Sequence, residues 1–221
     1  KEAEEEIEVV KDGFTIFRQK IGTWGKLVEL YEYYPENHKR KRKIMALFYV
    51  PDITESLELS EEEAAHAIRV LRLSVGSELE ITDGKGNLYR SVISSIAGKH
   101  CYVEIKEAVE MKKGWNGNIH IAVAPTKNMD RTEWLAEKAT EIGMNQLSFV
   151  LCDNSERKVI KTERVEKIVV SATKQSHKAT KPEVDEMMPF KKFITQDFKG
   201  QKFIAHCHDD EKQFLASAIK P

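Results

Sequence analysis

The chain has 221 residues, of which 41% are hydrophobic and 32% are charged, a balance typical of a globular protein in water. No apolar run approaches the length of a membrane span, and we expect neither a membrane segment nor a secretory signal. The formal net charge of −1 means that nucleic-acid binding would depend on local basic patches. The three cysteines, Cys101, Cys152 and Cys207, are far apart and form no CxxC, which favours a reducing cytoplasm over a disulfide framework or a zinc module.

Residues 1–44 differ from the remainder, and we expect them to be an extension of unclear origin. The acidic segment 2–12 predicts a helix, and segments 14–18 and 26–34 predict two strands. The five successive basic residues at 39–43 fit RNA contact, a localisation signal or an exposed linker. Met45 stands directly before a clean strand pattern, so we expect the main domain to begin there.

Residues 45–113 predict a small β domain with one helix. Its strands are expected at 47–50, 78–82, 88–96 and 101–105, with a tight turn over Asp83-Gly84-Lys85-Gly86. Ser60 and Glu63 form a capping box that opens the helix, whose apolar stripe is Ala64, Ile68 and Leu71. Short strands joined by glycine turns predict a small barrel.

Three basic side chains recur at every third position of that helix, namely His66, Arg69 and Arg72. One interpretation is that they contact RNA phosphates, which position the partner without reading its sequence. The other is that they form an exposed face that balances the acidic residues before it.

Residues 114–221 predict an α/β domain with a parallel sheet. A strand over 118–124 is followed by a helix that Asp130 and Glu133 would open and Gly143 would end, and by a strand from Leu147. The helix is expected to bury Leu135, Ala139 and Ile142. A strand, a helix and a second strand make a right-handed βαβ unit, whose ligands bind at the carboxyl ends of the strands.

Basic side chains follow both of these strands. Lys127 and Arg131 come after the first strand and Arg157 after the second. Three cations that converge on strand ends suit phosphates or a carboxylate. Along the helix, Lys138 and Glu141 share a face with Arg131 and Trp134, which fits either a site or a solvated charged row.

A second helix would begin at Thr162 and bury Val165, Ile168, Val169 and Ala172. Its far end, KQSHKATK at 174–181, is densely basic and fits RNA contact or solvation equally. A further strand is expected at 202–207, and His206 at its end fits a small-ligand site. Adjacent strand residues point to opposite faces, so the run His206, Cys207, His208, Asp209, Asp210 does not favour a metal site.

From Met45 onward, the chain resembles the bacterial 16S rRNA (uracil-N3)-methyltransferase family of the SPOUT superfamily. The resemblance rests on six motifs in family order: FYVP at 48–51, HAIRVLRL at 66–73 with DGKG at 83–86, PTKNMDRTEWLAEKATEIG at 125–143, SERK at 155–158, KQSHKATKPEV at 174–184 and KFIAHC at 202–207. Single motifs are weak, whereas the ordered series is specific and covers essentially all of 45–221.

The resemblance implies a fold of the α/β class. A PUA-like RNA-binding β-barrel at 45–113 would precede a SPOUT domain at 114–221, a parallel α/β domain with a trefoil knot. It also implies S-adenosylmethionine as methyl donor, 16S rRNA of the small ribosomal subunit as substrate, and a homodimer. By the same resemblance, Arg69 and Arg72 would bind rRNA, and Lys127 and Arg131 would line the catalytic side with Arg157. Gln175 and Lys178 would lie near the same cleft, and His206 would border the cofactor pocket.

The chain departs from the family at its carboxyl end. The family's Gly-Pro-Glu-Gly turn and Leu-Arg-x-Glu-Thr segment do not occur before Pro221. We therefore expect a truncated, inactive fragment with an incomplete SPOUT domain that lacks most of the cofactor site. No residue is a secure general base, since Glu133, Glu137 and Glu141 are candidates by type only. A non-catalytic RNA-binding remnant and a related SPOUT enzyme acting on tRNA remain alternatives.

Overall fold

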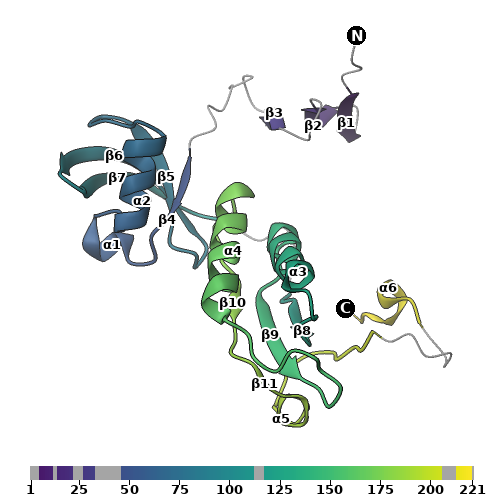
Figure 1. The fold of residues 1–221 in the computed structure, drawn as a ribbon. Helices are drawn as coiled ribbons and strands as arrows, with labels where there is room; N and C mark the ends of the chain where they lie inside the picture. The colour runs from purple at the N-terminus through teal and green to yellow at the C-terminus, as the bar shows by residue number, and fades with distance from the viewer. Residues whose placement is uncertain are drawn as a thin grey trace.

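The computed structural model describes residues 5–11, 14–21, 27–32, 46–111, 117–205 and 213–220. The first three segments are strands β1 (Glu5–Lys11), β2 (Phe14–Ile21) and β3 (Leu27–Glu32), which pair in that order as an antiparallel sheet (Figure 1). The helix predicted over 2–12 is therefore wrong in the described part, because β-branched residues alternate with glutamates there and the segment pairs with β2. The strands predicted at 14–18 and 26–34 are confirmed, while the basic run at 39–43 lies outside the described residues.

The small β domain is a mostly antiparallel sheet in the order β4-β5-β6-β7. Its strands are β4 (Leu47–Tyr49), β5 (Glu78–Thr82), β6 (Asn87–Ala97) and β7 (His100–Glu110). At the free edge of β7, the Leu59 amide donates to Cys101 O and the Val103 amide donates to Leu57 O, both at 2.9 Å. The chain after β4 thus passes from one edge of the sheet to the other, where Glu58 also forms an antiparallel bridge with Tyr102 of β7.

Three short helices cover the core of this domain: α1 (Ile53–Ser56), α2 (Glu61–Ala65) and the π-turn η1 (His66–Val70). Ser60 caps α2 as predicted, since its hydroxyl accepts from the Glu63 amide at 3.4 Å. Ala64 is buried, but Leu71 at the far end of the predicted stripe is 38% exposed. The π-turn inserts an extra residue into the helix and so rotates the following positions away from the core.

The α/β domain has a sheet in which three strands run parallel to β9 (Gln146–Leu151). They are β8 (His120–Val123) on one side and, on the other, β10 (Glu183–Val184) and β11 (Met188–Pro189). Helices α3 (Met129–Ile142) and α4 (Thr162–Gln175) lie side by side on one face of this sheet (Figure 1). Their core includes Leu147, Phe149, Val165 and Val169, so the predicted βαβ unit is confirmed.

The buried face of α3 differs from the prediction. It consists of Thr132, Ala136, Ala139 and Thr140, whereas Ile142 is 69% exposed. Thr140 tolerates burial because its hydroxyl donates to Ala136 O at 2.7 Å, so no polar atom is left unpaired. Of the three predicted positions, Ala139 is buried as expected and Leu135 is half-buried, so the prediction is wrong for Ile142. The helix also begins two residues earlier than predicted, because the Asn128 side chain accepts from the Asp130 amide at 3.0 Å.

The last described segments contain α5 (Phe190–Ile194) and α6 (Leu215–Ala218). The strand predicted over 202–207 is wrong for residues 202–205, which pair with no strand in the described part of the chain. Ile204 there is 76% exposed. A strand needs a ladder partner, and the segment is instead held by two hydrogen bonds between Gln201 and the backbone of Lys220.

Candidate functional site

The carboxyl ends of β8 and β9 carry two loops that Arg157 joins. Its Nη2 donates to Lys127 O at 2.8 Å and its Nε to Thr126 O at 3.3 Å. The structure therefore brings together Lys127 and Arg157, as the sequence predicts. However, the Arg157 guanidinium donates two of its hydrogen bonds to backbone carbonyls, so this residue positions the loop that follows β8.

Thr132, which the sequence analysis did not single out, fixes the same loop from inside α3. Its hydroxyl accepts from the Thr126 amide at 3.1 Å, and Thr126 Oγ1 donates to Asn128 O at 2.5 Å. Thr132 is buried, so its bond to the Thr126 amide is partly shielded from competing water, whereas the bond from Thr126 to Asn128 is exposed. The feature of the sequence that could have revealed Thr132 is a polar residue at a position of α3 that faces the apolar core.

Two cations at this end of the sheet remain available to an anion. The Lys127 side chain is 82% exposed, and its Nζ lies 3.5 Å from Glu156 Oε1, which is a loose surface ion pair. Arg131 is exposed in the first turn of α3, and within the described ranges it forms no ion pair or hydrogen bond through its side chain. A phosphate or a developing oxyanion at the strand ends would meet both side chains.

The three glutamates considered as general bases are each held in ion pairs. Arg164 Nε lies 2.6 Å from Glu133 Oε1, and this pairing raises the pKa of Arg164. Lys138 Nζ lies 2.8 Å from Glu137 Oε1 and 2.9 Å from Glu141 Oε1. The hydrogen bonds that Lys138 donates, first to Glu137 and then to Glu141, raise the pKa of Lys138. Since all three carboxylates are paired with a cation, the ion pairs do not distinguish one of them as a proton acceptor.

Gln175 and Lys178 lie at the opposite end of the sheet from this site. Arg164, which pairs with Glu133 near the start of α3, marks the near end of α4, and Gln175 is the last residue of α4. At 1.5 Å per residue the separation along the helix is roughly 16 Å. After α4 the chain enters β10, where Glu183 pairs with Gln146 at the start of β9.

The segment that follows α4 packs against the glycine turn of the small β domain. The Gly86 amide donates to Ala179 O at 3.0 Å, and the Lys181 amide donates to Gly84 O at 2.9 Å. Thr82 Oγ1 also donates to Ala179 O, at 2.8 Å. The last three residues of the basic segment 174–181 thus form a short antiparallel contact with the glycine turn of the small β domain.

Asp83 shapes the glycine turn for this contact. Its carboxylate accepts from the amides of Lys85 and Asn87 and from the side chains of Asn87 and Tyr89. Burial alone would raise the pKa of Asp83, but these hydrogen bonds outweigh it and hold the pKa below its usual value. The DGKG motif therefore has a structural explanation.

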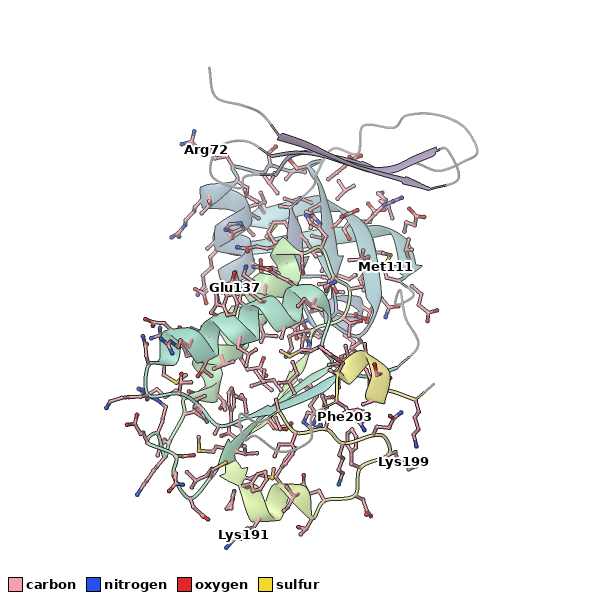
Figure 2. The ribbon with its side chains drawn as sticks, turned by 90° about the vertical axis from the view of Figure 1, so that its right-hand side faces the viewer. Arg72, Met111, Glu137, Lys191, Lys199 and Phe203 are labelled. Atoms are coloured by element: carbon pink, nitrogen blue, oxygen red, sulfur yellow. The ribbon has the colours of Figure 1, made fainter. Side chains whose placement is uncertain are left out.

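The three basic residues after α2 all reach solvent. His66, Arg69 and Arg72 are exposed, and the His66 ring packs edge-on against Phe48 with centroids 6.1 Å apart. Arg72 has a positive φ of 55° and points away from the domain (Figure 2). The predicted RNA contacts at Arg69 and Arg72 are thus sterically open.

The face of the sheet opposite α3 and α4 carries a polar network that the sequence analysis missed. His120 Nε2 lies 2.7 Å from Ser148 Oγ, and Ser148 donates a short hydrogen bond to Asp185. Burial lowers the pKa of His120, and the charge of Asp185 partly offsets this effect. His120 lies on β8, Ser148 on β9 and Asp185 directly after β10, so no local pattern in the sequence reveals the cluster.

His206 and the His/Cys/Asp run around it lie outside the described residues. Within the described ranges, no group of three or more His, Cys, Asp or Glu side chains could hold a metal ion. No helix in the same ranges is long and apolar enough to cross a membrane.

Comparison with protein families matches both halves of this architecture. Residues 59–106 match the family described as RNA methyltransferase PUA domain, and residues 113–220 match the family described as RNA methyltransferase domain. Fold and matches together define the class: an RNA methyltransferase domain that follows a PUA domain.

Named relatives agree with this class. Over 159 residues the chain is 24% identical to ribosomal RNA small subunit methyltransferase E of Rickettsia conorii, covering 71% of this chain and 63% of the relative. The crystal structure of a probable rRNA-methyltransferase from Porphyromonas gingivalis is 42% identical with a TM-score of 0.66, covering 69% of this chain and 64% of that one. The chain is similar to these rRNA methyltransferases, and it spans less than two thirds of the length of these two relatives.

A third comparison supports the fold alone. A ribosomal RNA small subunit methyltransferase E from Neisseria gonorrhoeae, bound to S-adenosyl methionine, is 22% identical with a TM-score of 0.62. The matched region covers 69% of this chain and 65% of that one. The predicted fold class, a PUA-like domain followed by a SPOUT-type α/β domain, is confirmed. The exact domain boundaries stay a prediction, since the join at 113/114 lies outside the described residues.

Proposed function

We propose that this chain belongs to an enzyme that transfers a methyl group from S-adenosylmethionine to N3 of a uridine in 16S rRNA of the small ribosomal subunit. The observation that carries the proposal is the ordered pair of RNA methyltransferase family matches on a fold whose strand ends present Lys127 and Arg131. The names of the relatives support rRNA as the substrate. A cytoplasmic location and a homodimer belong to the same proposal.

The chain's own residues would act on the RNA side of the reaction. Uracil N3 must be unpaired or turned out of its stack before it can react, because pairing occupies it in a duplex. Lys127 and Arg131 would hold a flanking phosphate or stabilise the negative charge that develops on the uracil oxygens as N3 loses its proton. Arg157 and Thr132 would keep the Lys127 loop in place through the backbone contacts already described.

The methyl donor, when bound, would supply an electrophilic methyl group on a sulfonium. Two surface pockets lie away from the strand ends: one along α4 at Glu163, Arg164 and Ile168, the other beside Glu63 and Lys174. His206 remains the proposed border of the cofactor pocket.

The decisive experiment compares methyl transfer to small-subunit RNA by the full-length enzyme and its Arg131→Ala variant. Removing a charge that stabilises a developing oxyanion is expected to lower kcat by about 100-fold. Arg90→Ala is the matched control, since Arg90 lies on β6 and pairs with Glu107 at 2.7 Å. Equal rates for wild type and Arg131→Ala would remove Arg131 from the mechanism.

Mapping the methylated nucleotide tests the substrate separately. Methylation at uridine N3 of 16S rRNA is the expected product. If tRNA is methylated instead, the proposed substrate is wrong, while the proposed reaction, methyl transfer to RNA, stands. RNA binding without methyl transfer by the full-length protein would overturn the catalytic proposal in favour of an RNA-binding protein.

A further inference from the structure

Trp134 is a largely exposed tryptophan on the outer face of α3. The residues that α3 buries are Thr132, Ala136, Ala139 and Thr140, and at about 3.6 residues per turn Trp134 lies on the opposite side of the helix. Trp134 is 62% exposed, and within the described ranges its indole makes no hydrogen bond and no ring contact. Packing of the domain therefore does not explain the indole, whose apolar rings are left largely in water.

Two cations lie between Trp134 and the strand ends. Arg131 precedes Trp134 by three positions, so the two side chains share a face of α3 and lie roughly 4.5 Å apart along the helix axis. Long side chains on a helix lean toward its amino end, which brings the indole over the turn that carries Arg131. Lys127, whose side chain is 82% exposed, lies in the loop before α3. The outer face of α3 therefore joins an aromatic surface to positive charge that the fold leaves accessible.

The surroundings of Trp134 do not resemble the centre of a protein interface. Its neighbours on the outer face are charged: Arg131 on one side, and on the other Lys138, which lies 2.9 Å from Glu141. The other exposed large apolar side chain of α3 is Ile142, roughly 12 Å further along the helix axis. Charged residues are depleted at the centre of protein interfaces, so an isolated indole among charges suits a different partner.

An unpaired nucleotide fits this combination of an aromatic ring and a cation. A base presents a flat π surface that stacks on an aromatic side chain, and the phosphate of the same nucleotide carries a negative charge. In a duplex, stacking neighbours cover the faces of each base, so the fitting nucleotide is one that has left its stack. Stacking on an aromatic ring tolerates every base, so this contact binds RNA without reading its sequence.

We propose that Trp134 stacks against an unpaired base that neighbours the methylated uridine, with the phosphate of that nucleotide beside Arg131 and Lys127. The proposal rests on the proposed function, since it adds a binding residue for the same RNA. Uracil N3 reacts only when its base is unpaired or out of the stack, and a neighbouring base held on Trp134 keeps the strand open at that point. Trp134 thus contributes to binding and does not touch the reacting atoms.

The test measures methyl transfer by the full-length enzyme to a 16S RNA fragment at varied RNA concentration. Trp134→Ala is expected to raise KM for the RNA about tenfold and to leave kcat within about twofold, because stacking holds the RNA equally before and during the reaction. Trp134→Phe keeps an aromatic ring and should recover most of this loss. Ile142→Ala removes an exposed apolar side chain from the far end of the same helix and should leave both constants unchanged.

Abasic RNA tests the same contact from the side of the substrate. Each nucleotide beside the uridine is replaced in turn by one that keeps its sugar and phosphate but lacks its base. At the position that stacks on Trp134, the change should raise KM about tenfold for wild type and hardly at all for Trp134→Ala, since both changes remove one contact. Losses that multiply independently at every position would overturn the proposal.

The outcomes separate this proposal from the proposed function. If wild type methylates the RNA and Trp134→Ala keeps the wild-type KM, the indole does not bind the substrate, while the proposed function stands. If Trp134→Ala instead dissociates an oligomer in analytical ultracentrifugation and an unchanged KM accompanies this, the indole belongs to a protein interface and the proposal is wrong. If wild type transfers no methyl group, both proposals fail. Trp134 is exposed, so its variants are expected to fold, which unchanged circular dichroism would verify.

Discussion

Glu63 on α2 and Lys174 near the end of α4 form an ion pair across the two domains, with Oε1 and Nζ 2.6 Å apart. The glutamate side chain is 7% exposed and the lysine side chain 26% exposed. The partners are thus unequal, since the ammonium can reach water and the carboxylate cannot. This asymmetry determines how the pair responds to mutation.

Lys174→Met is expected to destabilise the chain by about 3 kcal/mol, because it leaves a buried carboxylate without its counter-charge. Glu63→Gln should cost only about 1 kcal/mol, since the lysine can turn to solvent. The double variant Glu63→Gln/Lys174→Met should recover most of the loss. Urea unfolding of the three variants measures this order, and equal losses for the two single variants would show that burial of Glu63 does not matter.

Gly84→Ala is expected to weaken the contact between the glycine turn and the segment after α4. A Cβ at Gly84 would lie 2.7 Å from Tyr49 Cε2 and 3.1 Å from Lys181 Cβ, at a φ of +75°. Backbone strain and overlap together should cost roughly 2–4 kcal/mol. Gly98→Ala is the matched control, because Gly98 has a φ of +64° with no atom within 4 Å of the added Cβ. If the two variants lose the same stability in urea, strain alone explains the loss.

Arg157→Lys keeps the charge but cannot make both hydrogen bonds to the carbonyls of Thr126 and Lys127. The loop is expected to open more often, and the Thr126 amide to exchange its hydrogen about tenfold faster, which corresponds to roughly 1.4 kcal/mol. Arg131→Lys serves as the control, because no described residue pairs with that side chain. Hydrogen exchange read by NMR gives the rates. Unchanged exchange in Arg157→Lys would mean that the two bonds do not hold the loop.

His120 should make the stability of the chain depend on pH just below neutrality. Burial lowers its pKa from the ordinary value of 6.5, so the unfolded chain takes up the proton first as pH falls. The free energy of unfolding is therefore expected to decrease as pH drops through 6.5 toward the lower folded pKa, and this component to vanish in His120→Gln. His177→Asn, which removes an exposed imidazole at a φ of +50°, should keep the wild-type profile. A His120→Gln profile identical to wild type between pH 7 and 5 would refute the assignment.

Much of the architecture followed from local patterns in the sequence. The strands at 78–82 and 147–151, the Ser60 cap and the stop at Gly143 depend on residues close in the chain, and all are found. The ordered motifs also predicted the family. Lys127 and Arg157 were expected to meet because parallel strands end at one edge of a sheet, which is a property of the topology.

Tertiary structure decided what local patterns leave open. Gln175 and Lys178 lie beside cationic neighbours in the sequence, yet the direction of α4 carries them to the far end of the sheet. The glutamate of the capping box was expected to serve its own helix, but burial against Lys174 gave it a role between domains. Sequence determined which segments fold and in what order. Only packing determined which charged side chains stay free for a ligand. A charged side chain forms an ion pair or a hydrogen bond only with the neighbours that the three-dimensional fold places beside it.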